Sequence, residues 1–170
     1  MNIRPATPDD GDFLRKMVYE AAAWNPDWPH DQVVEALASP IVARYLEEWG
    51  REGDAGVIAE LDGEPVGAAW YRVFTEDAPG WGFVDGETPE LGIAVEPIHR
   101  RKGIGEALLR SLMVQAREDG FRALSLSVAA HNRSRMMYER AGFVKVRVDE
   151  LDPDTWVMRA TLEPADRAEG

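Results

Sequence analysis

Three cations lead directly into two glycines and the start of a predicted helix, in the stretch HRRKGIGEALLR. These residues are Arg100, Arg101, Lys102, Gly103 and Gly105. The first backbone N–H groups of a helix have no partner within it, and they carry the positive end of the helix dipole. Glycine lets an anion approach the backbone closely, and arginine can bind a phosphate through two parallel hydrogen bonds. The pattern is therefore typical of a pyrophosphate site.

Two other phosphate-binding motifs fit this stretch less well. Gly-x-Gly after a strand also occurs in dinucleotide-binding folds, but Leu108 stands where the fingerprint G-x-G-x-x-G needs its third glycine. The P-loop pattern G-x-x-x-x-G-K-[ST] is absent. On these residues alone, a glycine-rich turn flanked by solvated cations stays an alternative to an anion site.

The elements that position this stretch follow from hydrophobic periodicity. Residues 90–96 predict a strand directly before it. Residues 103–119 carry apolar side chains four apart, which predicts a helix that ends at Gly120. Residues 123–128 alternate strictly between apolar and polar, which predicts a further strand, and residues 132–141 predict a short helix.

The remaining elements complete a mixed α/β chain. Asp62-Gly63 between two apolar segments is a strong signal for a two-residue hairpin turn. Thr7 and Pro8 are typical of the start of a helix. The other predicted strands are residues 2–5, 55–61, 65–74, 143–148 and 155–162, and the other predicted helices are 8–21, 31–38 and 41–49.

Composition narrows the class of protein. A chain of 170 residues suits one domain, and the absence of cysteine excludes disulfides, thiolate zinc sites and a cysteine nucleophile. Three histidines without ligand spacing predict no metal site. A net charge of −12 disfavours a nucleic-acid partner, although one local basic patch can still hold a small anion. An acidic surface favours cationic substrates such as amines. An equally good explanation of the acidity is that it only keeps the protein soluble.

The sequence also bears on location. No window approaches the roughly 20 apolar residues of a membrane span. The first residues, MNIRPATPDD, lack the apolar run of a signal peptide. We therefore expect a cytoplasmic protein with no membrane partner.

Two motifs together resemble signatures of the GNAT superfamily of N-acyltransferases. The acyl-CoA-binding signature [RQ]-x-x-G-x-[GA] is matched by Arg100, Gly103 and Gly105. The second signature, N-x-x-[AS]-x-x-x-Y-E-[KR]-x-G-F, is matched by NRSRMMYERAGF, which is residues 132–143. The resemblance covers about residues 1–162. The chain departs from the family pattern in its N-terminal helical region and its loop 76–89, and these departures put the identity of the acceptor in doubt.

The resemblance implies an α/β fold with a mixed, mostly antiparallel central sheet, splayed middle strands and flanking helices. It implies a single acetyltransferase domain over residues 1–162, followed by a polar C-terminal tail over 163–170. The implied activity is transfer of an acetyl group from acetyl-CoA to a primary amine of a small molecule or peptide, by direct attack in a ternary complex. A non-catalytic acyl-CoA-binding module is the alternative, and a nucleotide-binding oxidoreductase is disfavoured by Leu108. Family members are often homodimers, but no interface is identified.

The resemblance also assigns binding roles. The backbone of the 90–96 strand would hold the pantetheine arm, and residues 100–105 would hold the pyrophosphate. Asn132 would bond the pantetheine, with helix capping as the alternative. The implied acyl-CoA contacts are Ile93, Ala94, Val95, Arg100, Arg101, Lys102, Gly103, Ile104, Gly105 and Asn132.

Two residues are the expected catalytic groups. Tyr138 would protonate the leaving thiolate, because a phenol with a pKa of about 10 is neutral at pH 7; packing on a helix face is its alternative. Glu90 would act as the base, directly or through water. The alternative is that Glu90 is only an exposed carboxylate at the end of a strand. Glu87 is a weaker candidate for the base. Aromatic side chains of the N-terminal region would wall the acceptor site or pack in the core: Trp24, Trp28, His30 and Trp49.

Overall fold

A computed structural model describes residues 1–164, which form one layered α/β unit. Its strands are β1 (Asn2–Pro5), β2 (Ala55–Leu61), β3 (Glu64–Arg72), β4 (Glu90–Val95), β5 (Ala123–Ala129), β6 (Val144–Val148) and β7 (Thr155–Thr161). Its helices are α1 (Gly11–Ala22), α2 (His30–Leu37), α3 (Pro40–Arg44), α4 (Ile104–Glu118) and α5 (Ser134–Arg140), with 3₁₀ turns at Pro8–Asp10 and Pro97–His99.

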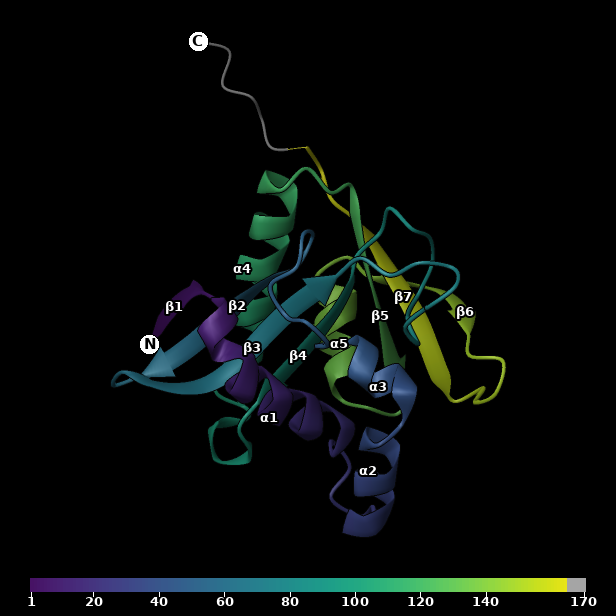
Figure 1. Cartoon of the computed structure of the whole chain (residues 1–170), viewed down its shortest axis with the longest axis horizontal. Coiled ribbons are helices and arrows are strands. Elements are labelled where there is room, and N and C mark those ends of the chain that lie inside the picture. Colours follow the sequence, from purple (N-terminus) through teal and green to yellow (C-terminus); the bar gives the residue numbers. More distant parts are fainter. Residues whose placement is uncertain (165–170) are drawn as a thin grey trace.

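Within the described residues the seven strands form one sheet in the order β1-β2-β3-β4-β5-β7-β6 (Figure 1). Every neighbouring pair is antiparallel except β4 and β5, which run parallel in the middle of the sheet. The expected mixed, mostly antiparallel sheet with flanking helices is therefore confirmed.

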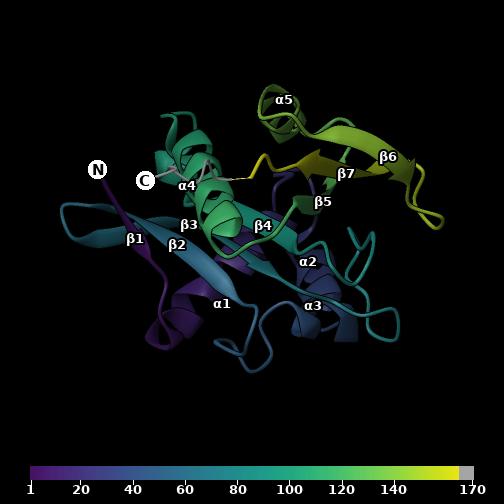
Figure 2. The same cartoon turned by 90° about the horizontal axis from the view of Figure 1, so that it is seen from above.

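The helices cover both faces of the sheet. α1, α2 and α3 lie on one side, the α1–α3 face, and α4 and α5 lie on the other, the α4–α5 face (Figure 2). Each face has its own buried apolar cluster, as expected for amphipathic helices on a sheet. Successive β4 residues alternate between the clusters, so that Leu91 belongs to the α4–α5 face and Ala94 to the α1–α3 face.

Local turn signals were reliable predictors. Asp62 and Gly63 both have positive φ, 52° and 84°, which is the geometry of a hairpin turn whose twist matches the flanking strands. Gly120 has a φ of 87° immediately after α4, where a left-handed residue ends a helix without a Cβ clash. Both predictions are confirmed.

The predicted helix over residues 41–49 is wrong in extent. α3 ends at Arg44, and turns follow. The buried Arg72 side chain donates through Nη1 to the carbonyl oxygens of Arg44 and Glu47, each at 2.7 Å. Glu48 then adopts a φ of 50°, which a continuing helix does not allow. A cation from β3 thus replaces the hydrogen bonds that would have extended the helix.

The C-terminal boundary stays a prediction. β7 ends at Thr161, and the expected polar tail over 163–170 lies outside the described residues from residue 165 onward. Among residues 1–164, no helix combines the length and the apolar character that crossing a bilayer requires.

Candidate active site

β4 and β5 separate almost as soon as they meet. Their register contains one Cα pair, Glu90 with Ser125, and the Ser125 N–H donates to the carbonyl oxygen of Pro89 at 2.9 Å. The strands then diverge, with α5 close to the opening (Figure 1). The facing edges beyond this pair are not bonded to each other, which leaves a gap in the middle of the sheet.

The backbone of β4 offers alternate residues to this gap. The Glu96 N–H donates to Val66 of β3 at 2.8 Å, whereas Pro89 bonds to β5 on the opposite edge. Backbone groups of successive strand residues point to opposite edges, so those of Ile93 and Val95 face the gap. The Ala94 carbonyl instead lies on the β3 side. Of the three expected pantetheine contacts on β4, two therefore have backbone groups directed at the gap.

Glu90 lies at the start of the gap and is not the exposed strand-end carboxylate considered as an alternative. It is 2% exposed and shares the α1–α3 face with Ala94. The Tyr45 hydroxyl and the Gly82 N–H both donate to Glu90 Oε1, the second at 2.9 Å. Burial raises the pKa of Glu90 to about 7, although both hydrogen bonds and the positive charge of Arg147 act to lower it.

The loop before β4 covers this carboxylate. A Cβ added to Gly80 would clash with Glu90 Oε2, and a Cβ on Gly82 would lie 2.5 Å from the Leu126 carbonyl carbon of β5. Glycine is therefore required at both positions for the loop to pack this closely. Glu87, the weaker rival for the base, is exposed further along the loop.

Three buried polar atoms beside the gap have no hydrogen-bond partner among residues 1–164: Trp70 Nε1, Glu90 Oε2 and Ser125 Oγ. A Cβ on Gly92 would lie 2.5 Å from the Trp70 ring, so the indole covers β4 one step beyond Glu90 on the same face. Ser125 points to this face too, because its neighbours Leu124 and Leu126 belong to the opposite cluster. Unpaired buried polar groups are costly, and a polar ligand at this position would satisfy them.

The anion site predicted from the sequence lies at the start of α4. Gly103 precedes the helix with a φ of 81°, and Arg101 also has a positive φ, 63°. Arg101, Lys102 and Gly103 are exposed, whereas Ile104 is buried in the α4–α5 cluster. A Cβ on Gly105 would meet Met137 of α5 at 3.6 Å, so the two helices approach here. The free N–H groups of the first turn thus open beside α5 and the gap.

Arg100, an expected acyl-CoA contact, has protein partners in this structure. Its Nε donates to the Val95 carbonyl at 3.0 Å, and its guanidinium forms an ion pair with Glu20 of α1 at 3.0 Å. The side chain therefore ties the end of β4 to α1 and occupies one backbone group of the gap edge. Arg101 and Lys102 are the cations of the motif that face solvent.

Tyr138 lies across the sheet from Glu90. It is 8% exposed within the α4–α5 cluster, and its ring packs edge-on to Phe143 with centroids 5.9 Å apart. Burial raises the pKa of its hydroxyl further above the usual phenol value, so the group stays protonated at neutral pH. A buried phenol and a buried carboxyl thus lie on opposite faces of the sheet.

The Asn132 side chain closes the turn directly before α5, whose N-cap residue is Arg133. Its Oδ1 accepts a hydrogen bond from the Ser134 N–H at 2.9 Å, in the turn that opens α5. One amide oxygen is thereby engaged, and its amide N–H₂ is the part of the side chain open to a pantetheine role.

The expected aromatic wall is only partly assembled. Trp24 packs edge-on against Trp28 and His131, with centroids 5.3 Å and 5.1 Å apart, and so links the end of α1 to the β5–α5 turn. His30 instead bonds the Tyr19 hydroxyl at 2.9 Å. Trp49 belongs to the α1–α3 cluster and donates to the Thr7 carbonyl, away from this group.

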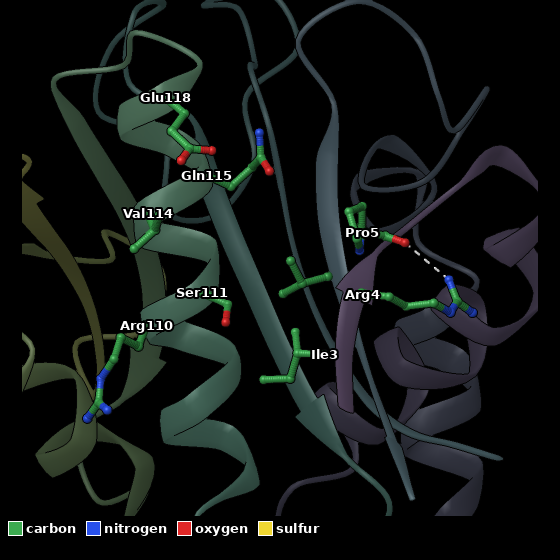
Figure 3. A pocket seen from close by; sticks show the side chains of 9 residues that line it. Ile3, Arg4, Pro5, Arg110, Ser111, Val114, Gln115 and Glu118 are labelled. Carbon is green, nitrogen blue, oxygen red and sulfur yellow. Dashed lines mark hydrogen bonds between the residues drawn. The ribbon is translucent and has the colours of Figure 1, made fainter. Parts of the chain in front are cut away.

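A separate groove lies between α4 and β1, on the far side of α4 from α5 (Figure 3). Its volume is about 330 Å³, and Arg4, Arg110 and Glu118 are among its lining residues. None of the expected catalytic or acyl-CoA-binding residues lines it. Within residues 1–164, no group of three or more metal-binding side chains is gathered.

Comparison with known proteins identifies the family to which the chain is similar. The model described as the acetyltransferase (GNAT) family matches residues 17–143. A mycothiol acetyltransferase of Propionibacterium freudenreichii subsp. shermanii is 37% identical over 107 residues, which are 62% of this chain and 32% of that protein. The L-amino acid N-acyltransferase MnaT of Escherichia coli (strain K12) is 27% identical over 135 residues, 78% of this chain and 70% of that one.

The fold is shared with solved structures. The PaiA N-acetyltransferase of Thermoplasma acidophilum, in complex with coenzyme A, superposes with a TM-score of 0.66 at 16% identity, over 95% of this chain and 99% of its own. The chain spans between 32% and 40% of the length of the mycothiol acetyltransferases that it matches.

Proposed function

This chain belongs to the acetyltransferase (GNAT) family, and from that membership we propose that it moves an acetyl group from acetyl-CoA to a primary amine. The acceptor would be a small molecule or a peptide, and transfer would be direct, within a ternary complex. The observation that carries the proposal is the pair of groups on either side of the gap. Glu90 lies on the α1–α3 face and Tyr138 on the α4–α5 face.

The donor would lie on the α4–α5 face. The free N–H groups at the start of α4, with Arg101 and Lys102, would hold the pyrophosphate, and the backbone of Ile93 and Val95 would hold the pantetheine. The coenzyme A bound to the T. acidophilum neighbour supports acetyl-CoA as the co-substrate. This placement brings the thioester to the gap from the side on which Tyr138 lies.

The acceptor would approach from the α1–α3 face. Most free alkyl amines have a pKa of about 10, so an attacking amine needs a base at neutral pH. Glu90 would take that proton, since a carboxyl with a pKa of about 7 exchanges protons readily at this pH. Because the carboxylate is covered, either the Gly80–Gly82 segment moves or water carries the proton. The unpaired Trp70 and Ser125 groups would contact the acceptor or the acyl oxygen.

The proposed reaction balances as a single displacement. The amine nitrogen attacks the thioester carbonyl carbon, an N–C bond forms, and the C–S bond breaks. Two protons leave the nitrogen of the ammonium group: one passes to Glu90 and then to solvent, and the other replaces, through water, the proton that Tyr138 gives to the departing thiolate. A backbone N–H on the gap edge of β4 would stabilise the oxyanion, a contribution typically of about 3 kcal/mol. The products are an amide and free coenzyme A.

The acceptor would be a small, cationic primary amine. The amino-acid substrate in the name of the E. coli relative supports a small primary amine, and the net charge of −12 favours a cationic one. A non-catalytic acyl-CoA-binding module is the second candidate, but a buried carboxyl with a pKa near 7 and a buried phenol on opposite faces of the sheet favour catalysis.

Release of free coenzyme A tests the proposal. The chain is incubated with acetyl-CoA and a panel of polyamines, aminoglycosides, amino acids and peptide N-termini, while thiol is followed with a chromogenic disulfide. We expect amine-dependent thiol release with at least one class. Thermal stabilisation by acetyl-CoA without thiol release for any amine would favour the binding module instead.

The pyrophosphate contact gives a separate prediction. Replacing both Arg101 and Lys102 with glutamine should raise the KM for acetyl-CoA about tenfold, equivalent to about 1.4 kcal/mol, with kcat little changed. Arg110→Gln is the matched control, because Arg110 is an exposed cation on α4 whose partner is Glu106, one turn away. Equal KM values for the double variant and the control would contradict the placement of the pyrophosphate.

A further inference from the structure

We propose that Tyr45 is a positioning residue for Glu90, and that the buried Arg72–Asp54 ion pair holds the backbone that carries Tyr45. Tyr45, Arg72 and Asp54 do not belong to any motif identified in the sequence. The inference rests on the proposed role of Glu90 as the base, and it concerns how the fold fixes one carboxylate oxygen while the other has no hydrogen-bond partner among residues 1–164.

The hydrogen bonds of the Tyr45 hydroxyl are directed at Glu90 and at the loop that covers it. Its hydroxyl donates to Glu90 Oε1 and accepts the Trp81 N–H at 2.9 Å. Its ring packs edge-on to Phe74 with centroids 5.1 Å apart, and the residue is 8% exposed. A rigid phenol therefore fixes both the carboxylate and the loop that covers it, whereas Glu90 Oε2 has no partner among residues 1–164.

The backbone around Tyr45 is held by a buried cation. Arg72 binds Asp54 through Nε at 2.8 Å and through Nη2 at 2.7 Å, with both side chains 1% exposed. Its remaining nitrogen, Nη1, donates hydrogen bonds to two carbonyl oxygens on either side of Tyr45, those of Arg44 and Glu47. A planar guanidinium can satisfy all of these acceptors at once, which a lysine ammonium cannot.

This anchor lies next to the base in the sheet. Arg72 is the β3 register partner of Glu90, so the ion pair and the carboxylate occupy neighbouring positions on the same face. The side chain of Arg44 adds a further link, since its Nη1 donates to the Pro79 carbonyl of the covering loop at 3.0 Å. The backbone around Tyr45 is thus held by hydrogen bonds from Arg72 of β3 and linked through Arg44 to the covering loop.

The groups that act on Glu90 come from several elements. Tyr45 donates from the end of α3, the Gly82 N–H donates from the loop, and Arg147 of β6 contributes a positive charge. Arg72 on β3 is compensated by Asp54. Removing the Tyr45 hydroxyl deletes one hydrogen-bond donor to the charged carboxylate. The Gly82 N–H and the positive charge of Arg147 stay in place, so the carboxyl of Glu90 should become harder to ionise.

Tyr45→Phe tests the positioning role. We expect kcat to fall about tenfold and the acidic limb of the pH–rate profile to move upward by about one unit, because a hydrogen bond to a charged group contributes on this scale. The KM for acetyl-CoA should stay within about twofold of the original value, since binding on the other face is untouched. The control is Tyr71→Phe, which removes a tyrosine–carboxylate hydrogen bond to Asp119 on the α4–α5 side.

A direct titration separates this inference from the proposed function. The Glu90 carboxyl is followed by ¹³C NMR in glutamate-labelled protein and assigned with Glu90→Gln. We expect its pKa to rise in Tyr45→Phe and not in Tyr71→Phe. If the pKa moves and the rate profile does not, or if neither moves, the positioning role is overturned. If Glu90→Gln itself keeps full activity, the proposed base is wrong, whatever Tyr45 does.

The anchor is tested by a double-mutant cycle. Arg72→Lys should shift the Glu90 titration in the same direction as Tyr45→Phe, because it frees the backbone on which the tyrosine lies. The double variant should lose little more in kcat than the larger single loss, since both changes break one contact. Additive losses in kcat, in protein that melts cooperatively, would contradict the coupling between Arg72 and Tyr45.

Discussion

Replacing Tyr138 with phenylalanine should lower kcat about 100-fold, with the KM for acetyl-CoA changed by less than about threefold. The loss follows from the chemistry of the leaving group, because a thiolate that is not protonated can return to the carbonyl carbon. Phenylalanine keeps the edge-on packing against Phe143 and removes only the hydroxyl. The fold should therefore be preserved, and the effect should appear in the chemical step.

The measurement is steady-state thiol release with a saturating amine, with Tyr71→Phe as the control. Tyr71 is a buried tyrosine of the same α4–α5 cluster whose hydroxyl bonds Asp119, outside the gap. Because burial holds the pKa of Tyr138 above that of an ordinary phenol, its ionisation should cause no loss of rate up to about pH 9. A Tyr138→Phe protein with the original kcat would remove the hydroxyl from the mechanism.

Replacing Glu90 with glutamine should lower kcat/KM at pH 7.5 by about two orders of magnitude, the usual effect of removing a general base. The base works only when ionised, so the rate of the original protein should rise with pH through about 7. Glutamine keeps an oxygen that can accept from Tyr45 and Gly82 but cannot take a proton. The acidic limb near pH 7 should therefore vanish in the variant, and a limb that persists unchanged would show that another group is the base.

The same carboxyl should make stability depend on pH. Its pKa is about 7 in the folded chain and 4.5 as the reference value, so between these values the folded state holds a proton that the unfolded state has lost. Stability should fall as the pH rises through this window, by up to about 3 kcal/mol for a shift of this size. Denaturant unfolding at pH 5 and pH 8 should show this loss in the original protein and a smaller one in Glu90→Gln.

Local sequence signals predicted the helices, strands and turns well, for a physical reason. A helix start, a glycine stop and a two-residue turn are each determined by a few adjacent residues, as Gly103, Gly120 and Asp62-Gly63 illustrate. The gap in the sheet was expected only from the resemblance to a family. The turn and helix signals and each of the two family signatures are short patterns of adjacent residues.

Long-range contacts were not accessible in the same way. Tyr45 lies 45 positions before Glu90, and no spacing rule connects an unremarkable helix-end tyrosine to a strand-start glutamate. Arg100 belongs to a recognisable motif, yet no spacing rule predicts its bonds to Val95 and Glu20. The early end of α3 has the same origin, because a buried Arg72 competes for its carbonyl groups. Each of these outcomes depends on the assembled sheet.

The most direct test of the account is the initial rate of thiol release when acetyl-CoA and the best amine of the panel are varied together. Direct transfer across the gap predicts intersecting double-reciprocal lines, one amide formed for each thiol, and no thiol burst when the amine is omitted. Parallel lines with an amine-independent burst would mean that the acetyl group first passes to the protein, and would contradict direct attack between Glu90 and Tyr138.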